Sequence, residues 1–96
     1  MVTLTAVFYA KPGCEMSLQK ILKNMLSPSR NESGCISYVL LNAIDQPSKF
    51  VFQEQFKDDE AFSEHTKTDY FNKMISEATP LLQDSPEITF YTVVSE

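Results

Sequence analysis

The chain has 96 residues, of which 43% are apolar and 22% are charged, and its formal net charge at pH 7 is −5. This length predicts one domain over residues 1–96 with a modest core, and the acidic balance argues against a nucleic acid or an anionic membrane as partner. No apolar run approaches the ~20 residues of a transmembrane helix, and the start of the chain lacks the pattern of a secretory signal.

The first half of the chain predicts a strand, a helix and a second strand. Residues 2–10 are rich in β-branched and aromatic residues, which is typical of a strand. Between residues 14 and 27 the apolar residues recur with the spacing of one helical face. Pro28 is expected to interfere with the last turn of this helix, and residues 29–34 then form a polar connection.

Two strands are predicted next, over residues 35–42 and 49–57, with a turn over residues 45–48 between them. The short link predicts an antiparallel hairpin. Apolar residues occupy both faces of the strand over residues 35–42, a pattern favoured when both sides are covered.

A second helical region begins after this hairpin. Asp58 is a good N-cap, and the acidic residues after it suit the positive end of the helix dipole. Thr68-Asp69 predicts a break or a second cap, after which a helical stripe continues to Thr79 and is ended or kinked by Pro80. Residues 87–94 have the composition of a fourth strand.

The element order β-α-β-β-α-β predicts an α+β protein with the ferredoxin-like plan. In this plan a four-stranded antiparallel sheet carries both helices on one side. The strands have Tyr or Phe, Val and Leu on both parities, so we expect the other side of the sheet to be apolar. Soluble monomers rarely expose a large apolar patch, and we therefore expect a homodimer in which two sheets meet face to face.

One strand carries a carboxylate in a row of aromatic side chains. Phe50, Phe52, Glu54 and Phe56 alternate along the chain and so share one face. Burying a carboxylate in such a row is expensive unless a partner lies close. The nearest downstream candidate is His65, the single histidine of the chain. We expect these two groups to meet at one wall of an apolar chamber.

Three segments, in this order and spacing, are similar to the antibiotic biosynthesis monooxygenase (ABM) domain family, and the similarity extends over nearly the whole chain. They are Glu32-Ser33-Gly34-Cys35-Ile36-Ser37-Tyr38, the run from Phe50 to Asp58, and the residues from Ala61 to His65 and from Asp69 to Phe71. The resemblance implies a dimeric α+β barrel.

The functions that the resemblance implies are diverse. Some members are cofactor-free oxygenases of quinols or polyketide-like aromatics, others degrade haem, and one group processes a small phosphorylated signalling sugar. Haem-degrading members carry an asparagine, a tryptophan and a haem-ligating histidine at positions that align with Ala6, His65 and Ile75 here. The chain has no tryptophan, and these departures argue against haem.

His65 is the first candidate for catalysis, as a base or acid near neutral pH, and the resemblance favours this role because family members place a histidine there. A structural histidine on an apolar helical face is the alternative. Glu54 is expected to orient His65 or to carry the proton itself, or else only to fix the sheet. Tyr38 is a candidate hydrogen-bond donor to a substrate oxygen, although strand tyrosines commonly only pack.

Four further residues are candidates for binding a substrate. Arg30 could attract an anionic group, but loop arginines often have no specific role. An apolar pocket would be built from Phe52, Phe71 and Met74, which are equally suited to an ordinary core.

No cofactor or metal is expected. A single histidine leaves too few nitrogen and sulfur ligands for a zinc or iron site. Cys14 and Cys35 are too few for a disulfide framework, so we expect free thiols and a cytoplasmic protein. Cys14 lies near a helix start but has no cysteine or histidine at motif distance, and we assign it no role.

The sequence therefore predicts a cofactor-independent monooxygenase of quinol-like or other aromatic hydroxyl compounds, with O₂ as co-substrate. An isomerase of a small keto or enediol compound, using the same histidine, is the alternative within enzymes. A non-catalytic ligand-binding dimer is a third hypothesis. The sequence does not identify the substrate or any assembly beyond a dimer.

Overall fold

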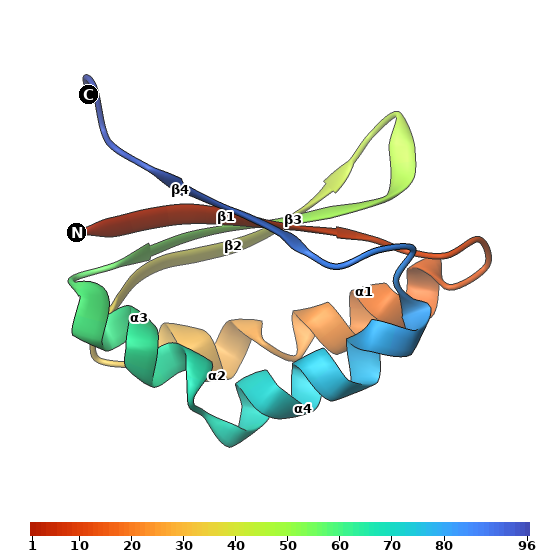
Figure 1. Ribbon diagram of the computed structural model, residues 1–96, viewed down its shortest axis with the longest axis horizontal. Helices are drawn as coiled ribbons and strands as arrows, with labels where there is room; N and C mark the ends of the chain where they lie inside the picture. Colours follow the sequence, from red (N-terminus) through yellow and green to blue (C-terminus); the bar gives the residue numbers. More distant parts are fainter.

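The computed structural model describes residues 1–96 and contains one sheet of four antiparallel strands. The strands are β1 (Val2–Tyr9), β2 (Cys35–Ala43), β3 (Gln46–Phe56) and β4 (Glu87–Tyr91), and their order across the sheet is β2-β3-β1-β4. This is the strand order of the ferredoxin-like α+β fold that the sequence predicts (Figure 1).

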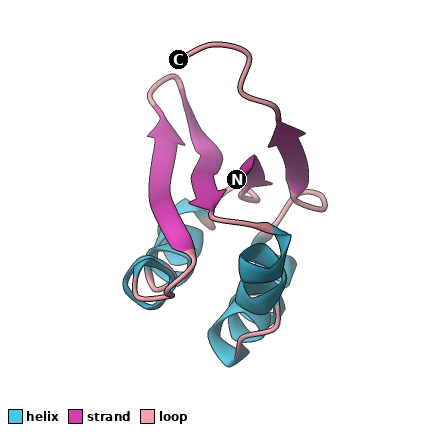
Figure 2. Ribbon diagram, turned by 90° about the vertical axis from the view of Figure 1, so that its left-hand side faces the viewer, coloured by secondary structure: helices cyan, strands magenta, loops and turns pink.

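All helices lie on one face of this sheet (Figures 1 and 2). They are α1 (Glu15–Lys23), α2 (Leu26–Arg30), α3 (Asp59–Thr66) and α4 (Asp69–Ala78), followed by the short 3₁₀ helix η1 (Thr79–Leu81). The core fills the space between the two layers. Strand alternation sends Leu4, Ala6 and Phe8 of β1 toward the helices, where all three are buried.

The predicted helix over residues 14–27 is two helices in the structure. The prediction of a loop at residues 29–34 is wrong for Ser29 and Arg30, which belong to the second of these helices. A turn at Asn24 and Met25 separates α1 from α2, which runs through Pro28 to Arg30. Pro28 is the third residue of α2. The first turn of a helix has no intrahelical acceptor for its N–H groups, so a proline is tolerated there.

The predicted turn at residues 45–48 is also shorter than expected, because β3 begins at Gln46 and only Ile44 and Asp45 lie in the turn. The side-chain amide of Asn42 donates to the backbone carbonyl groups of Pro47 and Lys49 and supports the irregular start of the hairpin. Strand β4 ends at Tyr91, three residues before the predicted end.

The break between α3 and α4 agrees with the sequence. The side chain of Asp58 accepts a hydrogen bond from the N–H of Ala61 and caps α3. The hydroxyl of Thr68 accepts from the N–H of Phe71 and caps α4, and it also donates to the carbonyl of His65 at the end of α3. Two caps in succession fix the angle between the helices and therefore the position of His65.

The sheet face opposite the helices is apolar only in part. Val7, Val39, Leu41 and Val51 form an apolar centre, since Val7 and Leu41 both pair with Val51. Toward the start of β1 this face carries polar residues, namely Thr3, Thr5, Ser37, Gln53 and Gln55. The prediction of a large apolar face is therefore corrected to a smaller apolar centre with a polar side. No helix in the structure has the length and apolar character needed to cross a membrane.

Candidate active site

A cavity of about 450 Å³ lies between the helix-facing side of the sheet and helices α3 and α4. Of its 14 lining residues, 11 are hydrophobic, and none is a lysine or an arginine. Its polar side chains are those of Tyr38, Glu54 and Thr66, while Phe90 and Ile88 of β4 stand at its exposed side. The remaining lining residues are Leu4, Ala6, Phe8, Phe52, Phe62, Phe71, Met74, Ile75 and Pro86.

Glu54 is the one carboxyl group among the residues that line this cavity. It lies in β3 between Phe52 and Phe56, on the face that is turned to the helices, and its side chain is buried. Burial, and then the negative charge of Glu32, raise the pKa of Glu54 to about 7. A carboxyl with this pKa is present in both protonation states near neutral pH, so it can accept and return a proton there.

His65 lies behind the cavity wall and is fully enclosed, with 1% of its side chain exposed. Its ring packs against those of Tyr38, Phe56 and Phe71. Its Nδ1 is 2.9 Å from Oε2 of Glu32, a hydrogen bond, whereas its Nε2 is 3.8 Å from Oε1 of Glu54 and has no hydrogen-bond partner. The imidazole therefore stands between two carboxyl groups, one on each side.

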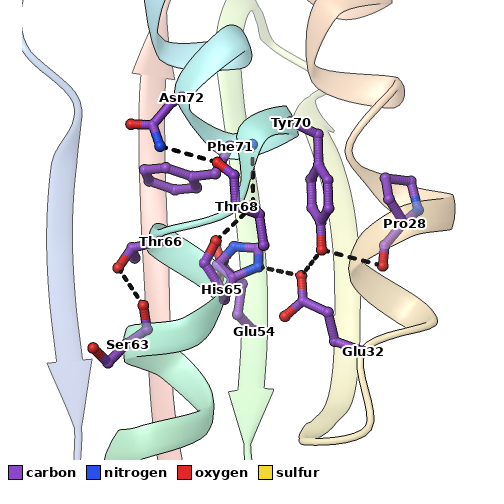
Figure 3. Close-up of polar contacts among 10 residues, drawn as sticks. All are labelled: Pro28, Glu32, Glu54, Ser63, His65, Thr66, Thr68, Tyr70, Phe71 and Asn72. Carbon is purple, nitrogen blue, oxygen red and sulfur yellow. Dashed lines mark hydrogen bonds and ion pairs between the residues drawn. The ribbon is translucent and has the colours of Figure 1, made fainter.

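Glu32 belongs to the connection between α2 and β2 and is partly exposed. The hydroxyl of Tyr70, from α4, donates to the same Oε2 atom that accepts from His65, and it also lies within hydrogen-bond distance of the carbonyl of Pro28 (Figure 3). Burial and the hydrogen bond to Glu32 raise the pKa of Tyr70 to about 12, so its phenol stays a donor. On its outer side Glu32 borders a polar surface groove with Lys57 and Glu60.

Tyr38 lies in β2, is buried and lines the cavity, with its ring 5.0 Å from that of Phe52. Burial, followed by the charge of Glu54, raises the pKa of the Tyr38 phenol well above its ordinary value. Its phenol therefore remains protonated and is a hydrogen-bond donor near neutral pH.

Close approach of β2 to α3 is needed to hold this arrangement. Gly34, which directly precedes β2, is buried against α3, and a methyl group at this position would overlap the side chain of Ala61. The backbone carbonyl of Gly34 also accepts from the N–H of Lys57 at the end of β3. Glycine at this position thus lets α3, and with it His65, lie close to Glu32.

The structure brings five of the seven predicted site residues together around the cavity: Tyr38, Phe52, Glu54, Phe71 and Met74. His65 contacts several of their rings but does not itself line the cavity. Arg30 lies elsewhere, at the end of α2, where its Nε donates to the carbonyl of Tyr38 at 3.0 Å. Glu54 lies 3.8 Å from Nε2 of His65 without a hydrogen bond, and the hydrogen bond to the imidazole is made by Glu32.

Glu32, Thr66 and Tyr70 are polar residues of the site that received no role from the sequence. Glu32 opens the first of the three segments that are similar to the family, and this was the signal available for it. The structure contains no group of three or more His, Cys, Asp or Glu side chains that could hold a metal ion. Glu54, His65 and Glu32 can therefore transfer protons at the edge of an apolar cavity.

Comparison with known proteins agrees with this architecture. The model of the family described as "Antibiotic biosynthesis monooxygenase" matches residues 1–77 of the chain. The crystal structure of PA3566 from Pseudomonas aeruginosa is 31% identical, with a TM-score of 0.92, and the match covers 98% of this chain and 94% of that one. YcnE of Bacillus subtilis, which is provisionally named a monooxygenase, is 27% identical over 82 residues, 85% of this chain and 86% of that protein.

A second curated relative is longer than this chain. The protein sll1783 of Synechocystis is 29% identical over 83 residues, which are 86% of this chain and 56% of the relative. The chain therefore spans little more than half of that protein.

Proposed function

This chain belongs to the antibiotic biosynthesis monooxygenase family, and on this basis we propose that it is a cofactor-independent monooxygenase of quinol-like or other aromatic hydroxyl compounds. The observation that carries the proposal is the position of Glu54, a buried carboxyl with a pKa of about 7 on the wall of an apolar cavity. A base with this pKa is matched to removing a hydroxyl proton near neutral pH.

In the proposed reaction Glu54 takes the proton of the substrate hydroxyl, while Tyr38 donates a hydrogen bond to the oxygen that becomes negative. The resulting anion is electron-rich and passes electrons to O₂. A phenol with a hydrogen on the ring carbon para to its hydroxyl then gives a quinone and water, and a hydroquinone with a hydrogen on an ortho carbon gives a hydroxyquinone and water. One oxygen atom of O₂ enters the product, the other leaves as water with the two substrate hydrogens, and the substrate supplies every electron.

The cavity favours a neutral aromatic substrate over an anionic one. Its volume of about 450 Å³ lies within the range of ~300–1,000 Å³ of small-molecule pockets. Phe52, Phe71 and Met74 offer apolar contact, and no lysine or arginine lines the cavity to balance a phosphate or carboxylate. This argues against the phosphorylated substrates that some family members process, and Arg30 is not in a position to bind them.

Oxygen uptake with a panel of naphthols and hydroquinones tests the proposal, after subtraction of the autoxidation rate without protein. The wild type should consume one O₂ per substrate, and ¹⁸O₂ should place one labelled atom in the product. Glu54→Gln should abolish the uptake, whereas the exposed Glu60→Gln should leave it unchanged. Substrate conversion without O₂ consumption would favour the isomerase, and binding without any conversion would favour a ligand-binding protein.

We also propose that the protein works as a homodimer in the cytoplasm, with the two sheets packed face to face through Val7, Val39, Leu41 and Val51. The partial exposure of these side chains on the face without helices supports this assembly. Two cysteines are too few for a disulfide framework, which favours a reducing compartment. Sedimentation at micromolar concentration should give a dimer for the wild type and a monomer for Val51→Lys, and a monomeric wild type would refute the assembly.

A further inference from the structure

His65 is held in an arrangement that the proton transfer at Glu54 does not by itself require. The imidazole lies between two carboxyl groups, with Glu32 at 2.9 Å from Nδ1 and Glu54 at 3.8 Å from Nε2. These three residues come from the connection after α2, from α3 and from β3. They form a polar row that crosses the apolar wall from the surface groove at Glu32 to the cavity at Glu54.

The hydrogen bond to Glu32 fixes which ring nitrogen carries the proton. A carboxylate is an acceptor only, so the neutral imidazole must donate its N–H from Nδ1. The lone pair of Nε2 then faces Glu54. Tyr70 donates to the same oxygen of Glu32 and holds that carboxylate in place from the other side (Figure 3).

The unpaired Nε2 is the second observation. It is buried without any hydrogen-bond partner, which is unfavourable in a protein interior. Its separation from Oε1 of Glu54 is longer than a hydrogen bond, and a small rotation of Glu54 would close it. Catalytic hydrogen bonds are often long before a substrate binds. An acceptor facing a protonatable carboxyl is suited to receive its proton.

We propose that Glu32 is a positioning residue that makes His65 a proton store for Glu54. The inference rests on the proposed function in taking Glu54 as the base that meets the substrate. Glu54 receives the hydroxyl proton and passes it to Nε2, so that Glu54 is a carboxylate again and His65 is an imidazolium between two carboxylates. The proton returns through Glu54 to the oxygen that leaves as water. In each turnover His65 takes up one proton from Glu54 and later gives it back, so the overall reaction is unchanged.

Nitrogen NMR of the ¹⁵N-labelled protein tests this without a substrate, because the chain has a single histidine. At alkaline pH the wild type should show a protonated Nδ1 and an unprotonated Nε2. In Glu32→Leu the remaining acceptor is Glu54, and the proton should move to Nε2. A wild-type ring protonated on Nε2 would overturn the proposal, whatever the activity.

Kinetics supply the second readout. Glu32→Leu should lower kcat by 10²-fold or more and change KM less than twofold, since Glu32 does not line the cavity. Glu32→Gln keeps an acceptor oxygen but no charge, so it should preserve the tautomer and lose less of kcat. The Glu32→Gln variant also tests the proposal if Glu32→Leu does not fold. The control is Glu60→Leu, an exposed residue of the same groove, which should change neither readout.

The outcomes separate this inference from the proposed function. If the wild type consumes no O₂ but has the expected tautomer, the monooxygenase proposal fails, while the role of Glu32 in positioning the His65 ring is supported. If the wild type is active and both Glu32 variants keep its kcat, Glu32 has only a structural role and the inference is refuted.

Discussion

Replacing Glu54 by glutamine should stabilise the protein, and the gain should grow with pH. Folding raises the pKa of Glu54 from 4.5 to about 7, first through burial and then through the charge of Glu32. A carboxyl whose pKa is raised on folding contributes stability that is present below pH 4.5 and is lost as the pH rises through 7. At about 1.4 kcal/mol per pKa unit, ionised Glu54 lowers the free energy of unfolding by about 3 kcal/mol above pH 8.

Glutamine has nearly the same shape and does not ionise, so Glu54→Gln should recover this free energy. At pH 5 the same linkage gives a gain of only about 1 kcal/mol. The variant also changes local hydrogen bonding, but that contribution is the same at both pH values. The measured quantity is therefore the difference between the gains at pH 9 and pH 5, which should be about 2–3 kcal/mol.

Urea unfolding of both proteins at pH 5 and pH 9 measures this difference. One fixed protein concentration is needed, because a dimer gains apparent stability with concentration. Glu60→Gln, at an exposed position, is the matched control and should show no such pH dependence. An equal effect of Glu54→Gln at the two pH values would mean that Glu54 ionises normally, and its assignment as a base matched to neutral pH would fail.

Three further predictions follow from the geometry of the site. The O₂ uptake rate should rise as the pH increases through about 7 and then level off, because only ionised Glu54 accepts a proton; a rate that falls over this range would contradict its role as the base. Tyr38→Phe should lower kcat about tenfold through one lost hydrogen bond, measured with an oxygen electrode, and unchanged kcat would assign Tyr38 to packing alone. Gly34→Ala should lower the free energy of unfolding by about 1–3 kcal/mol, because the new methyl group meets Ala61. Adding Ala61→Gly should restore most of this loss in urea unfolding, and a double variant as unstable as the single one would place the cause elsewhere.

Much of the fold could be predicted from local patterns. The alternation over residues 50–56 identified β3 and placed Glu54 on its buried face, and Asp58 and Thr68 marked both helix starts. The helix α2 was missed because Pro28 suggests an ending, while its first-turn position makes it compatible with a helix.

The site could be predicted less well, because its contacts join distant segments. Glu32 and His65 are 33 positions apart in the chain, and no local pattern reports their hydrogen bond. Which side of the wall His65 lies on depends on the rotation of α3. That rotation is set by the close approach of Gly34 to Ala61, a tertiary contact.

Stability alone does not account for the polar groups in this wall. A buried ion pair is often replaced by apolar residues without loss, and in many cases with a gain in stability. Here Glu54 has no hydrogen bond to His65, and Nε2 has no partner at all, so the pair lacks the geometry that offsets desolvation. An apolar side chain at Glu54 would continue the row of Phe50, Phe52 and Phe56 and would fill this wall at lower free energy. The arrangement is explained if a substrate hydroxyl completes it, because the proton that Glu54 then receives gives Nε2 a hydrogen-bond donor.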